Sequence, residues 1–348
     1  MNLTISDTTA MLLTSELGTS EKMALGILAL LVALVVTMLL TPVVMRWAIA
    51  ANAMVAPGGR HVHETATPRW GGLAMYVGFL VAVIVLEVVV WKLTGQNLVH
   101  RKIAGILFGG ALITALGAYD DKYNMKASYK LLGQALIAAI LVFPPFELRM
   151  AVAFNTDIFG LQQSSLVGLI FSSALTIIWI VLVTNIINLI DGLDGLAAGV
   201  SGISALTFVV IALLLKGPSS DPIMAAAVVG SCLGFLRYNF SPARIFMGDA
   251  GSHFLGYTIG ALSLLYNYKV ATGLAFAIPV LILAVPIFDT VFAIVRRMFR
   301  GKPIFTADKG HLHHRLLNMG LTQPQAVLTI YVITTIGCLV AIWLAMIR

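Results

Sequence analysis

Four polar side chains lie close together in the stretch TNIINLIDGLDGL (184–196), which ends a long apolar run. Asn185 and Asn188 are three residues apart, and Asp191 and Asp194 repeat that spacing. A helix places residues three apart on one face. Carboxylate and amide carbonyl oxygens ligate hard cations such as Mg²⁺, and amide NH₂ groups can hydrogen-bond a base or a sugar. A helix end with capping aspartates is the alternative, but four such residues on one spacing favour a functional site.

Further carboxylates stand at the ends of other apolar runs. Asp120 and Asp121 are adjacent in GAYDDKYNMK, and adjacent carboxylates commonly serve divalent metals. They could instead simply end a helix in solvent beside Lys122. Asp249 lies between small residues in FMGDAGS, where backbone and ligand can approach closely. Its alternative role is a helix cap.

The densest basic cluster is DKGHLHHRL (308–316). Its cationic and histidine side chains are Lys309, His311, His313, His314 and Arg315. The spacing lacks the glutamate of the zinc motif H-E-x-x-H, and no cysteine supports a zinc site. A cradle for a diphosphate fits better, because Arg and Lys donate charge-assisted hydrogen bonds to phosphate oxygens. An ordinary basic loop remains the alternative.

The chain that must position these residues is strongly apolar. Of its 348 residues 59% are hydrophobic and 11% are charged, so lipid must be the solvent for most of it. A helix crosses a bilayer in about 20 residues. We therefore predict an all-α, polytopic integral membrane protein, one domain over 1–348, with about ten spans. The predicted spans lie near 24–48, 71–93, 101–119, 130–147, 165–187, 194–215, 223–239, 251–267, 271–297 and 325–347.

The distribution of Lys and Arg predicts the orientation. The polar segment 1–22 has no basic region, and the run after it is longer than the roughly 7–15 apolar residues of a cleavable signal, so we expect a retained first span. If that span runs inward, fourteen of the 22 Lys and Arg lie inside. This excess predicts that both termini are extracytoplasmic and that the polar segments are cytoplasmic. The basic, glycine-rich segment 56–72, with His61, His63, Glu64 and Arg69, is adequately explained by topology and lipid headgroups.

With ten spans, all of these polar segments fall on one face of the membrane. Carboxylates would bind Mg²⁺, and cations would hold the phosphates that the metal does not reach. Phosphoryl transfer requires little beyond this positioning and charge neutralisation. A glycine loop of either common nucleotide-binding type is absent from these segments, and no nucleic-acid partner is expected.

The motifs DDKYNMKASYK, NIINLIDGLDGL, FMGDAGS and DKGHLHHRLLNMG, in this order, resemble those of the polyprenyl-phosphate N-acetylhexosamine-1-phosphate transferases. The resemblance extends from about residue 40 to 320. The HLHH form is similar to the UDP-GlcNAc branch, because muramoyl-pentapeptide phosphotransferases carry three consecutive histidines followed by Phe-Glu. Arg315 and the following LLNMG are most similar to enzymes that initiate teichoic acid or surface polysaccharide.

The resemblance implies a reaction and assigns roles. GlcNAc-1-phosphate would pass from UDP-GlcNAc to undecaprenyl phosphate in the bacterial cytoplasmic membrane, releasing UMP, with Mg²⁺ (or Mn²⁺ as a substitute) and an enzyme that is often a homodimer. Asp249 would ligate the metal, with Asn188 as a second ligand. Asp120 and Asp121 would face the lipid phosphate, Asp120 as the base.

The substrate contacts follow from the same motifs. Asp194 would lie near the uracil, Asn185 and Asp191 would shape the nucleotide site, and Lys130 would reach the diphosphate. The side chains that would hold the pyrophosphate and sugar are His311, His313, His314 and Arg315.

Several alternatives stay open at this point. The lipid phosphate could attack the β-phosphorus directly, which we favour because it is already a charged nucleophile, or an aspartate could first form a phospho-sugar intermediate. The sugar donor could be UDP-GalNAc or a muramoyl-pentapeptide nucleotide. An ion-coupled transporter is the alternative from another class, although its coupling carboxylates would lie near the bilayer midplane rather than at one face.

Overall fold

The computed structural model describes residues 17–55, 66–150, 166–215, 220–265, 272–299 and 310–347, without the side chains of 272–276. Within these residues the protein is almost entirely helical. The helices are α2 (Thr19–Ala50), α3 (Gly71–Thr94), α4 (Arg101–Tyr123), α5 (Ala127–Val142), α7 (Leu166–Ile190), α8 (Leu196–Leu214), α9 (Ser220–Asn239), α10 (Gly248–Leu265), α11 (Thr272–Ile282), α12 (Ala284–Phe299), α13 (Leu312–Asn318) and α14 (Gln323–Met346). Two short strands, β1 (Met54–Val55) and β2 (Thr67–Pro68), pair antiparallel.

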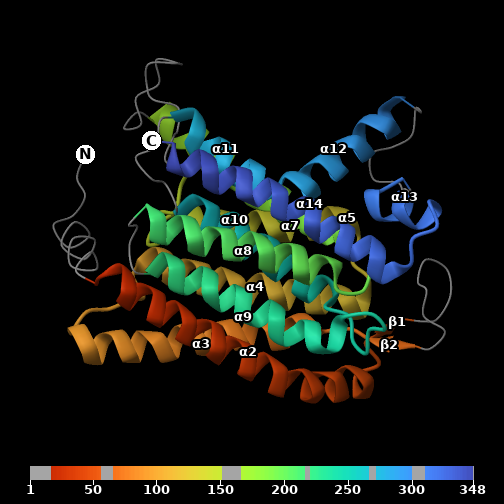
Figure 1. Cartoon of the computed structure of the whole chain (residues 1–348), viewed down its shortest axis with the longest axis horizontal. Coiled ribbons are helices and arrows are strands. Elements are labelled where there is room, and N and C mark those ends of the chain that lie inside the picture. The colour runs from red at the N-terminus through yellow and green to blue at the C-terminus, as the bar shows by residue number, and fades with distance from the viewer. Residues whose placement is uncertain are drawn as a thin grey trace.

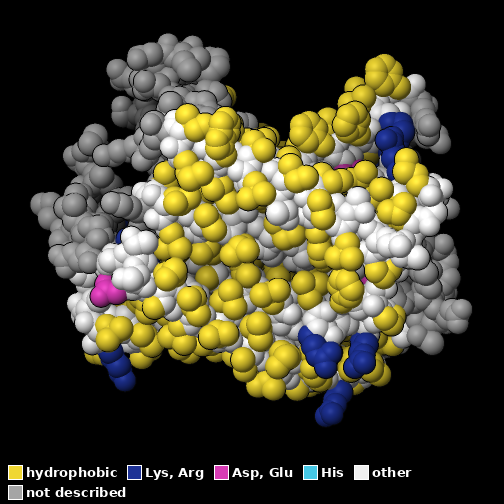
Figure 2. Space-filling view, in the orientation of Figure 1, with side chains coloured by type: hydrophobic (Ala, Val, Ile, Leu, Met, Phe, Trp, Pro, Cys, Tyr) yellow, Lys and Arg dark blue, Asp and Glu magenta, His cyan; other side chains and the backbone are white. Residues whose placement is uncertain are grey.

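Six of the described helices are long and apolar enough to cross a membrane: α2, α3, α4, α7, α8 and α14. They run roughly along one common direction in the bundle (Figure 1). Figure 2 shows a face covered largely by hydrophobic side chains, with Lys and Arg near the ends of the helices. Such an apolar exterior is stable in lipid and not in water. The predicted all-α, polytopic membrane fold is confirmed.

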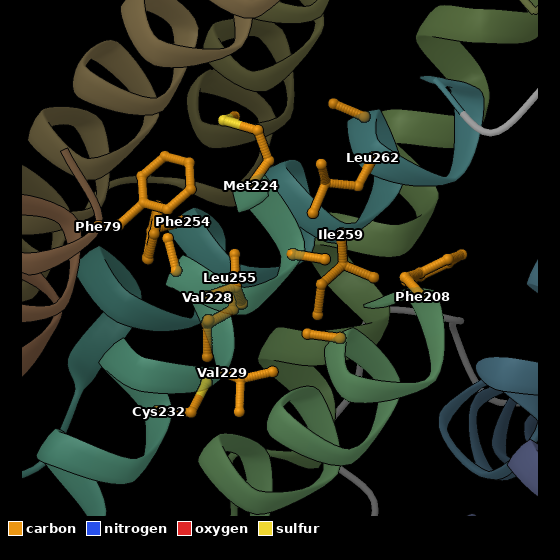
Figure 3. Packing of buried hydrophobic residues seen from close by; sticks show 14 of the residues in the cluster. Phe79, Phe208, Met224, Val228, Val229, Cys232, Phe254, Leu255, Ile259 and Leu262 are labelled. Atoms are coloured by element: carbon orange, nitrogen blue, oxygen red, sulfur yellow. The ribbon is translucent and has the colours of Figure 1, made fainter. Parts of the chain in front are cut away.

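The helix α10 lies at the centre of the bundle. Its residues from Ala250 to Leu264 are all buried, and Phe254, Leu255, Ile259 and Leu262 pack among side chains of α3, α8 and α9 (Figure 3). A helix that is buried on every side does not face lipid, so it can contain polar residues that have protein partners. This explains why α10 forms where a span is predicted and yet is not among the six helices that are long and apolar enough to cross a membrane.

Glycines bring neighbouring backbones close to the start of α10. A Cβ on Gly72 of α3 would clash with the backbone of Gly251, and a Cβ on Gly117 of α4 would clash with the carbonyl of Asp249. Small residues at such positions allow close helix packing in membrane proteins. The first turn of α10 is therefore held between α3 and α4, and the position of Asp249 follows from that packing.

The ninth predicted span, 271–297, is not one helix. It is divided into α11 and α12 at Leu283, and α12 points away from the bundle in Figure 1. Pro286 has no N–H to donate to the carbonyl of Ile282, and its ring crowds that carbonyl. The carbonyl instead accepts hydrogen bonds from the Ser204 hydroxyl (3.3 Å) and the Cys338 thiol (4.0 Å). The prediction of a continuous span was wrong because it relied on the number of apolar residues and overlooked the proline.

Three segments discussed above lie wholly or partly outside the described residues. These are 1–16, which belongs to the polar segment 1–22; 56–65, which contains His61, His63 and Glu64; and 300–309, which contains Lys309. The shortest predicted spans do form helices, and α5 ends at Val142 just before Pro144 and Pro145.

Candidate active site

Lys130 joins two of the predicted carboxylates. Its Nζ donates to Asp249 Oδ2 and forms an ion pair with Asp120 Oδ2. Asp120 ends α4, Lys130 begins α5 and Asp249 begins α10, so the contact joins three helix ends. The Asp120 side chain is 8% exposed, while those of Lys130 and Asp249 are 21% and 23% exposed. Carboxylates at this depth are stable when a cation neutralises them, and Lys130 supplies that charge.

Asp121 holds the start of α10. Its two carboxylate oxygens accept the backbone N–H groups of Asp249 (2.9 Å) and Ala250 (3.2 Å). The first backbone N–H groups of a helix have no partner within the helix, and the helix dipole favours an anion beside them. Gly248 has φ +69° and lies against this carboxylate, where a Cβ would clash. Arg69 Nη1 lies 3.8 Å from Asp121 Oδ1, so segment 56–72 contributes a cation to the site in addition to its predicted role at the headgroups.

The loop before α10 is fixed by the segment before α3. Phe246 donates its N–H to the carbonyl of Pro68 (2.9 Å), and Gly71 and Gly72 donate theirs to the carbonyls of Phe246 and Met247 (both 3.0 Å). The backbone leading into Asp249 is therefore paired, and little freedom remains in the position of this carboxylate.

Asn188 is oriented by its amide group. Its Nδ2 donates to Asp249 Oδ1 and to Ser252 Oγ, both at 2.9 Å. A side-chain NH₂ has two hydrogens to donate, so both are used and Oδ1 remains as the acceptor. An amide oxygen beside a carboxylate is a suitable pair of ligands for Mg²⁺, which takes one or two protein carboxylates and completes its shell with water and substrate phosphates.

The described residues contain no group of three His, Cys, Asp or Glu side chains that could enclose a metal. A cation held by Asp249 and Asn188 would therefore depend on phosphates for further ligands. This donor set fits Mg²⁺ and would not form a closed zinc site.

The link between α7 and α8 contains the two remaining predicted aspartates. Burial, followed by the negative charges of Asp249 and Asp121, raises the pKa of Asp191 to about 8. Asp191 therefore belongs to the same acidic cluster. Asp194 is buried, and its Oδ2 accepts the backbone N–H of Ala243 (3.0 Å). It supports the loop that precedes α10, and its role near the uracil stays a prediction.

The histidines lie on α13, a short helix within a segment interpreted from sequence as a loop. Asp289 of α12 fixes its start: Oδ1 accepts the N–H of Leu312 (2.7 Å), and Oδ2 lies 2.9 Å from His311 Nδ1. His313 lies against Gly192, where a Cβ would come within 2.7 Å of its Nε2. This contact brings α13 to the link that contains Asp191.

The histidines differ in their surroundings. The ring of His313 stacks on His311 at 5.7 Å and contacts His314 at 4.3 Å between centroids. Burial, followed by the charge of His314, lowers the pKa of His313 to about 4. His313 is therefore neutral at pH 7, and it could offer a ligand hydrogen bonds but no positive charge. Arg315 is exposed on α13, and among the residues that the structure describes its side chain has no partner in a hydrogen bond or ion pair.

Comparison with known proteins identifies the chain. Residues 103–267 match the model of glycosyl transferase family 4. A probable undecaprenyl-phosphate N-acetylglucosaminyl 1-phosphate transferase of Bacillus subtilis is 42% identical over 323 residues, which cover 92% of this chain and 86% of the relative. The chain belongs to this family.

Other relatives of the transferase differ in acceptor or sugar. A decaprenyl-phosphate N-acetylglucosaminephosphotransferase of Mycobacterium leprae is 36% identical, with 86% of this chain and 79% of the relative covered. A phospho-N-acetylmuramoyl-pentapeptide-transferase of Desulforudis audaxviator is 31% identical, with 89% and 94% covered. The expected family is confirmed, and the protein is a multi-pass membrane transferase of phosphosugars.

Some residues at the site of the transferase were not predicted from sequence. Ser252 and His253 lie three and four residues after Asp249, and Gln134 lies four after Lys130. Helical spacing alone could have indicated these three. Asp289 is the one carboxylate in the run 284–299, and an isolated carboxylate in an apolar run is a sign of function. It was overlooked because the run was interpreted as a plain span.

Proposed function

We propose that this transferase moves GlcNAc-1-phosphate from UDP-GlcNAc to undecaprenyl phosphate and releases UMP, in a bacterial cytoplasmic membrane and with Mg²⁺. The relatives from Bacillus subtilis and Mycobacterium leprae are named for N-acetylglucosamine and a polyprenyl phosphate. The contact of Lys130 with Asp120 and Asp249, beside Asn188, is the observation that best supports the proposal. It brings oxygens that could bind a metal beside a cation that could bind phosphate, at one end of the bundle.

The reaction requires alignment of two phosphate groups. An oxygen of the lipid phosphate attacks the β-phosphorus of the UDP-sugar, the bond from that phosphorus to the bridging oxygen breaks, and UMP leaves with the electron pair. A cation bound by Asp249 and the Asn188 carbonyl would neutralise charge on the diphosphate. Lys130 would donate to the same phosphates, and Asp120 would accept a proton if the lipid phosphate arrives protonated.

The helix α13 completes the proposed site, next to the link between α7 and α8. His313 and His314 would hydrogen-bond the sugar or the diphosphate, and Arg315 would pair with a phosphate. We favour direct attack by the lipid phosphate over a phospho-aspartate intermediate. Among the predicted acidic groups, Asp120, Asp121 and Asp249 each already accept a hydrogen bond or form an ion pair within the protein, and such contacts reduce the nucleophilicity of a carboxylate.

The proposed orientation places this site in the cytoplasm. In Figure 1, β1, β2 and α13 lie at one end of the bundle, while α2 begins and α14 ends at the other. The excess of Lys and Arg near the site end supports a cytoplasmic position for it. The homodimer suggested by the resemblance stays a prediction.

The test is a direct assay. Purified protein is incubated with Mg²⁺, undecaprenyl phosphate and a panel of radiolabelled UDP-sugars, and lipid-linked product is separated from UMP. We expect label from UDP-GlcNAc to enter the lipid fraction, and EDTA to stop this. Glu147→Gln is the control for the loss of a carboxylate, because Glu147 pairs with Arg101 and Arg149 at the end of the bundle opposite to the site. This variant should transfer sugar like the wild-type protein. Preference for another UDP-sugar would overturn the assignment of the sugar, and label on the protein without lipid would overturn direct attack.

A further inference from the structure

A second layer of polar side chains lies one turn deeper in the bundle than the candidate metal ligands. The metal layer comprises Lys130, Asn188 and Asp249; the deep layer comprises Gln134, Asn185 and His253. Each deep residue is three or four positions from a metal-layer residue on the same helix, and so lies on the same face. Because α5 and α10 begin at the site and α7 ends there, all three deep residues lie on the bilayer side of their partners.

Asn185 is oriented in the same way as Asn188. Its Nδ2 donates to Gln134 Oε1 (2.6 Å) and to the carbonyl of Val181 (2.8 Å). Both amide hydrogens are used, so Oδ1 is left as an acceptor. Two amide oxygens, one helical turn apart, are thereby available on the face of α7 that carries the site.

Gln134 and His253 determine this orientation. Because Gln134 Oε1 accepts from Asn185, its Nε2 faces His253 Nε2, at 3.3 Å. An amide NH₂ can only donate, so His253 Nε2 must accept, and the ring proton lies on Nδ1. His253 is fully buried, and in the part of the chain that the structure describes its Nδ1 has no hydrogen-bond partner. A buried donor without a partner is destabilising, so a leucine would suit this position better if packing were its only role.

The two layers are in contact. His253 Nε2 lies 3.8 Å from Asp249 Oδ2, one turn earlier on α10. Mg²⁺ usually keeps several water molecules, whose hydrogens need acceptors beyond the first shell. Asn185 lies one turn below Asn188 on α7, and its amide oxygen has no hydrogen-bond partner among the described residues, so it can accept such a hydrogen.

We propose that Gln134 and His253 are positioning residues that make Asn185 an obligate acceptor for a water molecule of the bound cation. The proposal rests on the Mg²⁺ site of the proposed function. It assigns Asn185 to the outer sphere of the metal, in place of the nucleotide contact that the resemblance implies. Outer-sphere partners of this kind change metal affinity about 10–100-fold.

The experiment measures metal binding apart from catalysis. Mn²⁺ is titrated into the purified full chain in detergent, and free Mn²⁺ is followed by electron paramagnetic resonance. We expect Gln134→Met and His253→Leu to weaken Mn²⁺ binding about 10–100-fold. In the transfer assay the Mn²⁺ concentration that gives the half-maximal rate should rise by a larger factor than the maximal rate falls, because no group that contacts the phosphates is removed.

Conservative and control variants separate positioning from packing. His253→Gln places an amide oxygen near the position of Nε2 and should restore most of the Mn²⁺ affinity. Thr258→Val changes another buried polar residue of α10 whose hydroxyl has no described partner, and should leave Mn²⁺ binding unchanged. If His253→Leu does not fold, Gln134→Met carries the test, because Met neither accepts a hydrogen bond from Asn185 nor donates one to His253.

Two results would overturn the proposal. Wild-type Mn²⁺ affinity in both Gln134→Met and His253→Leu would exclude the outer-sphere role. A loss of melting temperature and turnover with no change in the Mn²⁺ dissociation constant would show that the deep layer only packs α5 against α10. If wild-type protein binds no Mn²⁺ and transfers sugar in EDTA, the metal of the proposed function fails as well, so the two failures are distinguishable.

Discussion

The two halves of the candidate site are held in different ways. The bundle half consists of the site residues of α4, α5, α7 and α10, where Lys130, Asp121 and Asn188 link helix ends that are packed within the core. The limb half consists of α12 and α13, which extend from the break at Leu283. Within it, Asp289 of α12 holds His311 and Leu312 at the start of α13. The apolar side chains Phe288, Phe292 and Phe299 of α12 are exposed.

This difference suggests that the two halves have different functions. A site for a metal and a diphosphate benefits from fixed geometry, because misplaced charges lose most of their stabilising effect. In the bundle half, that geometry is fixed by contacts among the protein's own side chains and backbone. The limb half can change its position while the packing of the bundle stays intact, so we expect it to adjust to the substrates. The predictions below test this contrast.

The largest effect is expected in the bundle half from Asp249→Asn. The change keeps the shape of the side chain but removes the charge that would bind the cation and that pairs with Lys130. Transfer to lipid should fall about 10²–10³-fold or more, and excess Mg²⁺ should not restore it. Lipid labelling gives the rate, and a thermal unfolding curve checks that the protein is folded. Near-normal labelling would remove Asp249 from the site.

Gly117→Ala tests how rigid the bundle half is. The new methyl group would clash with the backbone carbonyl of Asp249, which cannot rotate away. Overpacking of this kind costs about 1–3 kcal/mol, and a displaced carboxylate should lower activity about 10²-fold. Melting temperature and labelling should therefore fall together. An unchanged melting temperature would show that the bundle half yields more easily than the packing indicates.

Asp289→Ala removes the attachment between the two helices of the limb half. His311 and the N–H of Leu312 lose their acceptor, so the start of α13 becomes less well placed. We expect about a 10–10²-fold loss of transfer, mostly as a raised KM for the UDP-sugar, with the melting temperature little changed. Mn²⁺ affinity serves as the control, because the metal ligands belong to the other half. A large loss of Mn²⁺ binding would contradict the division proposed here.

Gly192→Ala is the counterpart of Gly117→Ala at the contact between the bundle and the limb half. Its methyl group would come within 2.7 Å of the His313 ring, and a side chain on a short helix can move. The expected result is a modest loss of activity, about tenfold or less, at an unchanged melting temperature. If Gly192→Ala and Gly117→Ala destabilise the protein equally, the two halves do not differ in rigidity.

The smallest effect concerns pH. The pKa of Asp191 is raised to about 8, so the folded protein holds a proton that the unfolded chain releases near pH 4. The contribution of Asp191 to stability is therefore complete below pH 4 and is lost as the pH rises from about 4 to 8. Asp191→Asn should remove this dependence. Melting temperatures of both proteins across that interval test it, and parallel curves would place Asp191 outside the acidic cluster.

Much of the bundle half could be predicted from sequence because its residues stand at helix ends with regular spacing. Asp120, Asp121, Asn188 and Asp249 each follow or precede an apolar run, so one topology brings all of them to the same face. The limb half was harder to predict. Asp289 lies inside a run that is apolar enough to be interpreted as a span, and the effect of Pro286 on that run was overlooked.

The amino-acid sequence by itself determined that this protein is helical, that lipid surrounds it and that its polar residues gather on one face, because these properties depend on composition and on local helical geometry. Only the tertiary structure decided that Lys130 joins Asp120 to Asp249, which lies 119 residues after the lysine, and that His313 lies on Gly192. Such pairings depend on how closely helices approach and in which direction a broken helix continues. Those are properties of packing between distant segments, and no local pattern in the sequence specifies them.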